Sequence, residues 1–207
     1  IPTFSFSLLP DVLGQLRKEE DDTHTIVYIH NTPAIVDAVR LQQFDIGIVS
    51  RSPPYTGVHS LYQTEVNYVA LVPENHTLAG SKDSLDLRKV AGFEEFITFG
   101  NVYPLEMQGM DEDLAFQFQS KAKYSVANVL AATALVRAVG VPALVDPFSA
   151  RISATAGGVV IRPIQQKLTY HIGIITRDIE VMTRETRQLA DELIGAFQAD
   201  PLIKTAG

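Results

Sequence analysis

Small polar residues stand at the points where the apolar segments of this sequence begin or end. Hydroxyl and amide side chains often mark the start of a helix. A helix start attracts anions, because its first N–H groups are unpaired and the helix dipole is positive there. Each such residue alone is more often a cap or a turn than a ligand contact. Together they predict a site for a small molecule with a carboxylate, formed by Thr3, Ser5, Ser7, Asn31, Thr32, Ser50, Thr98, Gly100, Asn101 and Asn128.

Asp146, in the segment ALVDPFSA, adds a negative charge at the end of a strand-like run. Two interpretations stay open: its carboxylate binds an ammonium or guanidinium group of the ligand, or it caps the following helix. Phe4 and Phe148 are candidates to enclose an aliphatic part of the ligand, or else are ordinary core aromatics. An amino acid or amino-acid derivative would satisfy both charged ends of such a site.

Patterns typical of catalysis or metal binding are missing from the sequence. The chain has no cysteine, and no P-loop, G-x-G-x-x-G or G-x-S-x-G motif occurs. Glu94 and Glu95 are adjacent beside a predicted strand, so their side chains are expected to point to opposite faces. Paired metal-ligand spacing is absent among the histidines, which are His24, His30, His59, His76 and His171. We therefore expect no catalytic residue, no cofactor and no metal.

The stretch Thr25–Ser50 is expected to position the first of these polar residues. Thr25–His30 is a β-branched and aromatic run, Thr32 is a good N-cap with Pro33 at the first helical position, and Asp45–Ser50 is again strand-like. Two short strands joined through one helix are normally parallel, and ligands bind beyond their carboxyl ends. The rim of a pocket is thus predicted at Asn31, Thr32, Ser50 and Arg51.

Hydrophobic periodicity and turn residues predict the remaining elements. A helix begins near the start of the chain, capped by Ser7 or by Thr3, and Pro10 is better tolerated if Ser7 is the cap. Further helices are expected after Ser84 and over Pro104–Gln119, Val126–Val139 (ended by Gly140) and Thr183–Gln198. Strands are expected over Tyr68–Val72, Glu95–Phe99, Ala143–Asp146 and Tyr170–Thr176.

The order of these elements and the composition predict an α/β protein of two lobes joined by two crossover strands. Residues 1–65 and 177–207 would form lobe I and residues 66–176 lobe II. The formal net charge of −7 and the lack of a basic run do not favour contact with nucleic acid by this part of the protein. No apolar stretch is long enough to span a membrane, and the N-terminus suggests that the natural chain starts further upstream.

Several segments resemble the effector-binding domain of LysR-type transcriptional regulators. They occur in the family's order and spacing, and the resemblance covers essentially all 207 residues. Thr77 replaces a proline of the usual P-x-x-H-P-L-A motif, and Gln43 stands where a glycine is common. The matching segments are PTFSFSLLPDVLGQL, AIVDAVRLQQFDIGIVS, ALVPENHTLA, LVRAVGVPALVDPFSA and IRPIQQKLTYHIGIITR.

The resemblance implies two Rossmann-like lobes of the periplasmic-binding-protein type II kind, with an effector bound in the cleft between them. It also implies a cytoplasmic protein that forms dimers or tetramers and binds DNA only through an N-terminal winged helix-turn-helix domain, which is absent from this sequence. The family's cleft contacts, transferred by position, are Thr3, Phe4, Ser5, Asn31, Thr32, Ser50, Thr98, Gly100, Asn128, Asp146 and Phe148.

The Asp-Pro-Phe triplet at Asp146 is similar to that of family members that sense amino acids and opines. The resemblance therefore suggests nopaline, an arginine-derived opine, with its guanidinium group on Asp146 and its carboxylates on the hydroxyl groups. Two alternatives remain: a solute-binding protein of an amino-acid or opine transporter, which would need an upstream leader, and an enzyme on the same scaffold, which would need a positioned acid, base or nucleophile.

Overall fold

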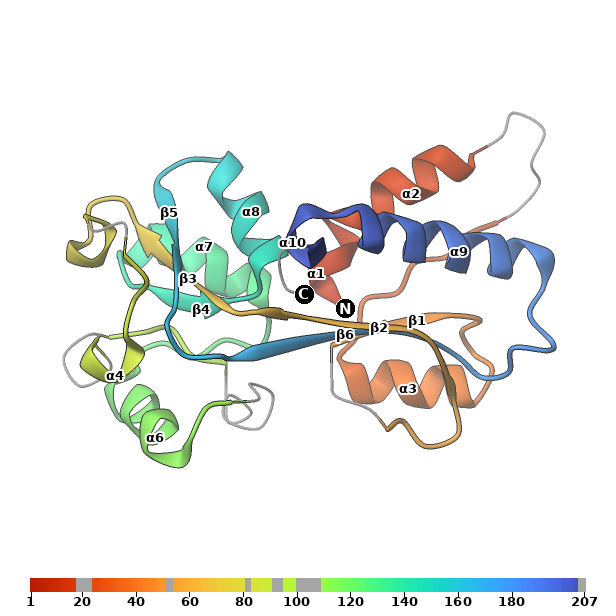
Figure 1. Cartoon of the computed structure of the whole chain (residues 1–207), viewed down its shortest axis with the longest axis horizontal. Coiled ribbons are helices and arrows are strands. Elements are labelled where there is room, and N and C mark those ends of the chain that lie inside the picture. Colours follow the sequence, from red (N-terminus) through yellow and green to blue (C-terminus); the bar gives the residue numbers. More distant parts are fainter. Residues whose placement is uncertain (18–23, 51–53, 81–82, 91–94, 100–108, 205–207) are drawn as a thin grey trace. The chain divides into compact units, whose positions relative to one another are not determined.

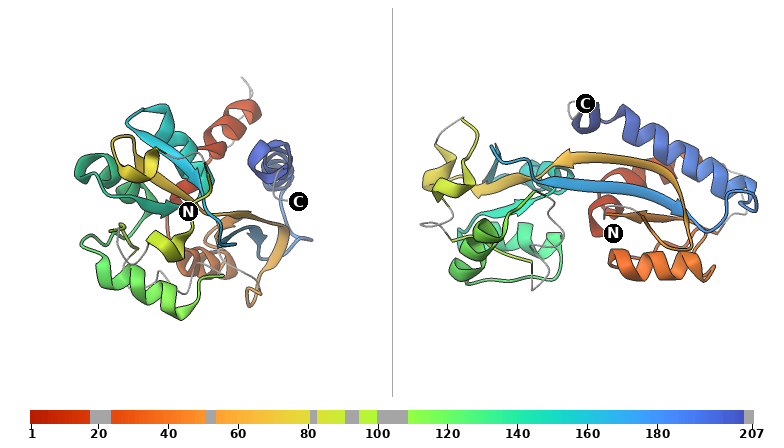
Figure 2. Two further views of the ribbon diagram at one scale, coloured as in Figure 1. Left: turned by 60° about the vertical axis from the view of Figure 1, so that its left-hand side comes forward. Right: turned by 60° about the horizontal axis from the view of Figure 1, so that its bottom comes forward.

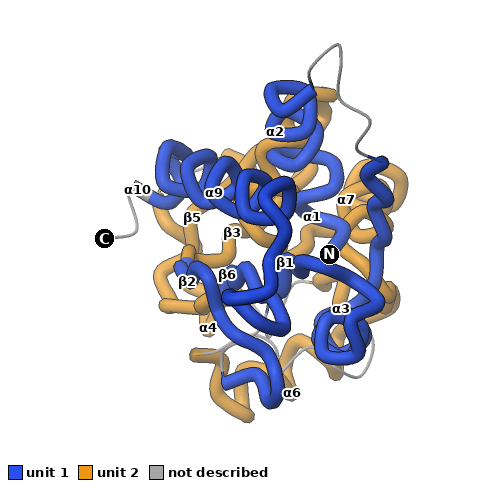
Figure 3. Tube along the Cα trace, turned by 90° about the vertical axis from the view of Figure 1, so that its right-hand side faces the viewer, with its two compact units in different colours: residues 1–65, 171–207 blue, residues 66–170 orange. Residues whose placement is uncertain are grey.

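A computed structural model describes residues 1–17, 24–50, 54–80, 83–90, 95–99 and 109–204 of the chain. Two compact units are present: unit 1 contains residues 1–65 and 171–207, and unit 2 contains residues 66–170 (Figure 3). The chain passes between the units along two long strands, β2 (His59–Asn67) and β6 (Thr169–Thr176). Each unit combines one small sheet with helices.

Unit 1 is built on a sheet with the strand order β1-β6-β2, in which β1 is Gly47–Val49. β1 runs antiparallel to β6, with Gly47 opposite Ile175 and Val49 opposite Gly173. Helix α3 lies on one side of this sheet, and helices α2 and α9 lie on the other (Figures 1 and 2). The helices of the unit are α1 (Pro2–Ser5), α2 (Leu8–Leu16), α3 (Thr32–Arg40), α9 (Arg184–Ala199) and α10 (Pro201–Lys204).

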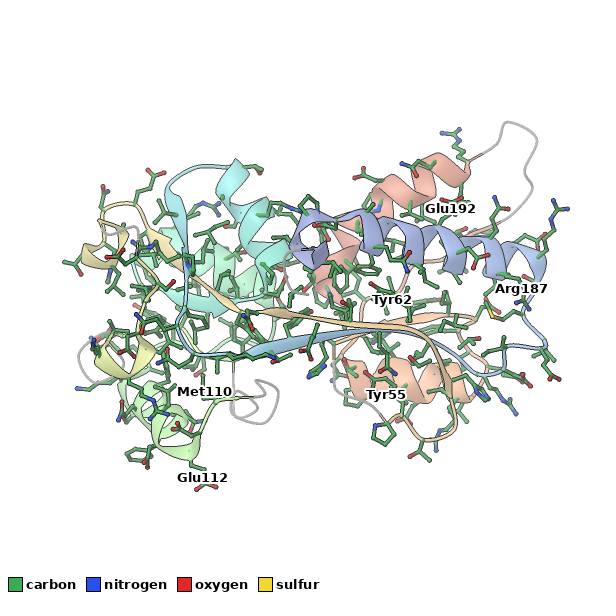
Figure 4. The ribbon with its side chains drawn as sticks, viewed as in Figure 1. Tyr55, Tyr62, Met110, Glu112, Arg187 and Glu192 are labelled. Carbon is green, nitrogen blue, oxygen red and sulfur yellow. The ribbon has the colours of Figure 1, made fainter. Side chains whose placement is uncertain are left out.

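Close packing holds α3 on β1 and α9 on the rest of unit 1. A Cβ atom added to Gly47 would lie 2.6 Å from Cγ2 of Ile35, so the helix approaches the strand more closely than any larger residue allows. The ring of Phe197 in α9 contacts the ring of Phe4 edge-on, with their centroids 4.9 Å apart. It also stacks on the ring of Tyr62, with their centroids 5.9 Å apart. Tyr62, on β2, is labelled in Figure 4. The close approach of Ile35 to Gly47 thus holds α3 against β1.

Unit 2 is built on a sheet with the strand order β4-β3-β5, formed by Ala143–Val145, Val69–Pro73 and Val159–Pro163. Both outer strands run antiparallel to β3. Helices α7 (Val129–Val139) and α8 (Pro147–Thr155) contribute to one apolar core with this sheet. The shorter elements are η1 (Thr77–Ala79), α4 (Leu87–Val90) and α6 (Glu112–Lys121).

Several predicted elements are confirmed within a few residues. Helix α2 follows Ser7 and holds Pro10 in its first turn, and α9 follows Thr183, whose side chain accepts the N–H of Thr186. Helix α7 ends at Gly140, whose φ of 73° is left-handed and suits glycine. The strands predicted around residues 68–72, 143–146 and 170–176 are β3, β4 and β6.

The predicted strand Thr25–His30 is wrong: these residues belong to no strand, and all of them are exposed. Only the centre of the predicted Asp45–Ser50 strand forms β1, which pairs antiparallel with β6 instead of parallel with residues 25–30. A β-strand needs a neighbour for its N–H and C=O groups, and the described part of the chain offers none to Thr25–His30. Asn31, not Thr32, caps α3.

Three further boundaries differ from the predictions. Helix α4 begins at Leu87 instead of directly after Ser84, and the carboxylate of Asp86 accepts the N–H of Arg88 at 3.1 Å. The helix predicted over residues 104–119 begins only at Glu112, behind the cap Asp111, while residues 104–108 lie outside the described ranges. In the segment predicted as strand 95–99, Ile97 and Thr98 form single bridges. Among the described helices, none combines the length and hydropathy of a membrane span.

Candidate functional site

In unit 1, the first residue of α3 meets the residue that follows β1. The hydroxyl oxygen of Thr32 accepts the backbone N–H of Ser50 at 3.1 Å, and the two side-chain oxygens lie 3.4 Å apart. Thr32 is buried and Ser50 is half-buried. Because the Thr32 oxygen already accepts one hydrogen bond, its own proton can be donated to Ser50 or to a ligand. Thr32 and Ser50 are called the unit 1 hydroxyl pair below.

Asn31 lies directly beside this pair and caps the helix. Its Oδ1 accepts the N–H of Ala34 at 3.1 Å, and its backbone carbonyl accepts the N–H of Ile35. The side chain is exposed. Asn31 therefore satisfies one of the first N–H groups of α3 and adds a polar group at the surface of the same helix end.

The predicted contacts in α1 are mostly turned to the interior of unit 1. Thr3 and Phe4 are 3% and 1% exposed, and Phe4 packs on Phe197. The Ser5 hydroxyl donates to the carbonyl of Ile1 at 3.1 Å, and the carbonyl of Thr3 accepts from the Ser7 hydroxyl at 2.9 Å. Phe4 thus has the position of a core aromatic, the second of its two interpretations.

In unit 2, Thr98 pairs with a residue that the sequence did not indicate as a contact, Ser125. Their hydroxyl oxygens lie 2.8 Å apart, and the two backbones form a parallel bridge. The carbonyl of Thr98 also accepts the N–H of Val126 at 2.8 Å. Thr98 is 1% exposed, whereas Ser125 is exposed. A hydroxyl side chain directly before the predicted helix Val126–Val139 was the only sequence signal for Ser125.

Asn128 follows this pair, called the unit 2 hydroxyl pair, by three residues. It caps α7 through its Oδ1, which accepts the N–H of Ala131 at 2.9 Å, and its side chain is exposed. The structure thus brings Thr98 and the start of α7 together, although 30 residues separate Thr98 from Asn128 in the sequence. Each unit carries a hydroxyl pair next to an asparagine-capped helix.

Asp146 caps α8, as one of its two interpretations requires. Its Oδ1 accepts the N–H of Ser149 at 2.8 Å, and the residue is 2% exposed. Phe148 is fully buried, and the guanidinium carbon of Arg151 lies 5.7 Å from its ring centroid. Both residues belong to unit 2. The other predicted positions, Gly100, Asn101 and Arg51, lie outside the described ranges.

Lys123 and Glu95, near the unit 2 hydroxyl pair, form an ion pair. Lys123, two residues before Ser125, lies 2.5 Å from a carboxylate oxygen of Glu95. The hydrogen bond and the charge of Glu95 raise the pKa of Lys123 above its ordinary value. Glu95 is therefore an ion-pair partner in this structure. Within the described ranges, no cluster of three or more histidine or acidic residues could hold a metal ion.

A groove of about 1060 Å³ lies within unit 1. Phe4 and Ser5 line it, whereas Thr32 and Ser50 do not. Its walls combine apolar side chains, such as those of Leu9 and Leu193, with polar ones, such as those of Gln43 and Glu185.

Comparison with known proteins gives one family match and many structural likenesses. The model of the LysR substrate binding domain matches residues 1–198. The effector-binding domain of QuiR in complex with shikimate is 20% identical, with a TM-score of 0.71, over 93% of this chain and 91% of that one. The Synechocystis CcmR regulatory domain in complex with 2-PG is 14% identical, with a TM-score of 0.73, over 93% and 92%.

A third likeness is a mutant of OxyR from Corynebacterium glutamicum, 18% identical with a TM-score of 0.70. The match covers 95% of this chain but only 62% of the OxyR chain, so that protein contains a large part with no counterpart here. A search of curated protein sequences found no match. At these low sequence identities, the structural similarity shows a shared fold and nothing more specific.

Proposed function

Because the chain belongs to the LysR substrate-binding domain family, we propose that it senses a small effector with a carboxylate group for a LysR-type transcriptional regulator. The observation that carries this proposal is the unit 1 hydroxyl pair at the N-terminus of α3. Thr32 is buried, is fixed by the N–H of Ser50, and keeps a hydroxyl proton to donate. A helix start with such a donor favours an anionic group.

The second part of the proposed site is the unit 2 hydroxyl pair with Asn128. We propose that the unit 2 hydroxyl pair and Asn128 also contact the effector, as the family resemblance implies for these positions. Such an effector regulates only if it binds one arrangement of the two units more tightly than another. The hydrogen bonds that it forms with each pair would supply that difference in affinity.

An amino acid or amino-acid derivative is the effector class that we propose. Two solved relatives contain shikimate and 2-PG, which supports a small-molecule ligand for a domain of this fold. The comparisons do not favour opines over other amino-acid derivatives, so nopaline is one member of the panel to be tested. Its guanidinium group would require the carboxylate of Asp146, which also caps α8.

For the whole protein, we propose that a separate N-terminal domain binds DNA in the cytoplasm and that the regulator acts as a dimer or tetramer. The net charge of −7 agrees with DNA contact through another domain. The family match does not favour the transporter alternative. Family relatives are regulator domains, which supports a binding role without catalysis.

A titration of the protein with Thr32→Val tests the proposal. A thermal-shift screen of amino acids, their derivatives and opines first identifies a ligand, since a ligand at about 100 times its Kd raises the free energy of unfolding by about 2.7 kcal/mol. Loss of one hydroxyl hydrogen bond to a carboxylate should then weaken calorimetric binding by about 10- to 100-fold. Because the variant also removes the acceptor of the Ser50 N–H, its free energy of unfolding should fall by about 1–3 kcal/mol, and the affinity is measured at a temperature at which the variant is folded.

The matched control is Thr155→Val, the same chemical change at an exposed hydroxyl that donates to the carbonyl of Ile152 in α8. This variant should bind the ligand as the unchanged protein does. Equal affinities of the Thr32→Val variant and the unchanged protein would refute the role given to the unit 1 hydroxyl pair.

A further inference from the structure

Tyr55 is a polar aromatic residue of unit 1 that is not among the predicted site residues. It belongs to the segment 54–58, which precedes β2, and it is half-buried. Its phenol end rests on the backbone of Gly173 in β6. A Cβ atom added to Gly173 would lie 3.4 Å from the hydroxyl oxygen of Tyr55 and 3.6 Å from its Cε2. Glycine at position 173 therefore leaves the space that the phenol occupies.

The phenol of Tyr55 lies on the side of the unit 1 sheet that carries α3. A Cβ atom at Gly47 would meet Ile35 of α3, so Gly47 faces this helix. Residues two apart in a strand share a face, so Val49 also faces α3. Val49 is the partner of Gly173 in the β1–β6 ladder, and a Cβ atom at Gly173 would lie 3.1 Å from Cγ2 of Val49. Tyr55 and Val49 are therefore neighbours on one face.

This position places Tyr55 beside the unit 1 hydroxyl pair. Val49 is followed by Ser50, whose N–H is accepted by the hydroxyl oxygen of Thr32. Partner residues in an antiparallel ladder have Cα atoms about 4.5–5.5 Å apart, and the next residue of the strand is about 3.8 Å further on. Hydroxyl groups at such neighbouring positions can each donate to one oxygen of the same carboxylate.

The segment that carries Tyr55 is also held at a second point. Gly57 has a φ of 78°, in the left-handed region that favours glycine. A Cβ atom at Gly57 would lie 3.0 Å from Cδ of Arg40, the last residue of α3, so the backbone packs on that side chain. The guanidinium group of Arg40 in turn lies 2.9 Å from a carboxylate oxygen of Asp37. Packing on Arg40 and on Gly173 thus positions Tyr55 before any ligand binds.

We propose that the Tyr55 hydroxyl is a further effector contact, which donates a hydrogen bond to the carboxylate bound at the unit 1 hydroxyl pair. The inference rests on the proposed function, because it assigns a second donor to the same carboxylate. Thr32 donates to one carboxylate oxygen and Tyr55 to the other. A phenol suits this role, because its O–H is a good donor and its rigid ring loses little conformational entropy when a ligand binds.

Tyr62 provides a matched control on the opposite face of the same sheet. It is half-buried, and its ring stacks on that of Phe197 in α9. In Figure 4, Tyr62 lies on the α9 side of the sheet and Tyr55 on the α3 side. Replacing either tyrosine by phenylalanine removes one hydroxyl group and keeps the ring. The packing on Gly173 or on Phe197 should therefore persist in each variant.

A titration with acetate, a probe that carries only a carboxylate and a methyl group, tests the inference. NMR spectroscopy follows the backbone amide of Ser50 and the Cζ signals of Tyr55 and Tyr62. Acetate should shift the signals of Ser50 and Tyr55 and leave that of Tyr62 in place. Acetamide is the uncharged probe of the same shape, and it should shift the signals far less, because hydrogen bonds to a charged acceptor are stronger.

The affinity for acetate, taken from the Ser50 amide, distinguishes the two tyrosines. The Tyr55→Phe variant should bind acetate about 10-fold more weakly than the unchanged protein, since it lacks one hydrogen bond to the carboxylate. The Tyr62→Phe variant should bind acetate with unchanged affinity. Equal losses in both variants would overturn the inference, because the loss would then not depend on the face of the sheet.

Two further outcomes separate this inference from the proposed function. If acetate shifts the Ser50 amide with the same Kd in the Tyr55→Phe variant and in the unchanged protein, the carboxylate site stands and the role of Tyr55 is refuted. If acetate leaves the Ser50 amide of the unchanged protein in place, the unit 1 hydroxyl pair binds no carboxylate, and the proposed site and this inference are both refuted.

Discussion

At the scale of single residues, Asp146 combines two roles that one substitution separates. Its Oδ1 caps α8 by accepting the N–H of Ser149, and asparagine performs that role equally well without a charge. In the Asp146→Asn variant, a ligand that places a cation on this carboxylate should bind about 10- to 100-fold more weakly. A ligand without a cationic group should bind unchanged. Calorimetric titration with one ligand of each kind measures both affinities.

The Asp146→Ala variant is the companion to this experiment. It removes the cap as well as the charge and should lower the free energy of unfolding by about 1 kcal/mol more than Asp146→Asn. If Asp146→Asn left the affinity for every cationic ligand unchanged, Asp146 would be a helix cap alone, and the guanidinium of an opine would have no partner there.

At the scale of elements, the approach of α3 to β1 depends on Gly47. The Cβ of Gly47→Ala would lie 2.6 Å from Cγ2 of Ile35, so helix and strand must separate. We expect a loss of about 1–3 kcal/mol in the free energy of unfolding, measured by urea denaturation. Gly195→Ala is the control, since an added Cβ at this exposed position in α9 meets nothing within 4 Å.

The control should change stability in the opposite direction. Alanine in place of glycine inside a helix adds about 0.5–1 kcal/mol to the free energy of unfolding. A Gly47→Ala variant as stable as the unchanged protein would mean that α3 does not rest against β1 through Ile35.

Helix ends with local signals could be predicted from the sequence, whereas the pairing of a strand with a distant partner could not. Thr183, Asn128 and Gly140 mark helix ends through their own side chains or backbone, and the structure confirms those helices. The run Thr25–His30 has strand composition, but a strand exists only with a partner, and none of the described residues supplies one. The composition of Thr25–His30 is typical of a strand, but it carries no information about which segment would pair with it.

At the scale of the whole molecule, the sequence predicted the α/β class with two periplasmic-binding-protein-like lobes, and the family and structural matches confirm it. The regulator family is likewise confirmed. The hydroxyl pairs show the limit of such prediction. Thr32 was indicated beside Ser50, but Ser125 was missed because its partner Thr98 lies 27 residues away. Ligand contacts predicted by position remain predictions.

The stability of the chain that starts at Ile1 should depend on pH in a defined direction. Burial lowers the pKa of the Ile1 amine from 8.0 to about 6, so between these values the unfolded chain binds more protons than the folded one. The free energy of unfolding therefore rises with pH across this window, by at most about 2–3 kcal/mol, and is constant above it. Urea denaturation at several pH values measures this change.

N-terminal acetylation is the control for this pH effect. An acetylated Ile1 has no amine to titrate, so this contribution to the pH dependence should disappear while other groups keep theirs. The same rise with pH in the acetylated chain would assign the effect to another group and contradict the buried environment of Ile1.

The two hydroxyl pairs have a consequence for selectivity. The two hydroxyl oxygens lie 3.4 Å apart in Thr32 and Ser50 and 2.8 Å apart in Thr98 and Ser125, and in each pair either oxygen could be the donor. A hydroxyl that rotates its proton changes from donor to acceptor without any movement of heavy atoms. Such positions accept either a hydrogen-bond donor or an acceptor on the ligand. Among ligands that carry the carboxylate favoured by the helix start, the hydroxyl pairs would therefore select by size and outline, and ligands of similar shape with different remaining polar groups would compete.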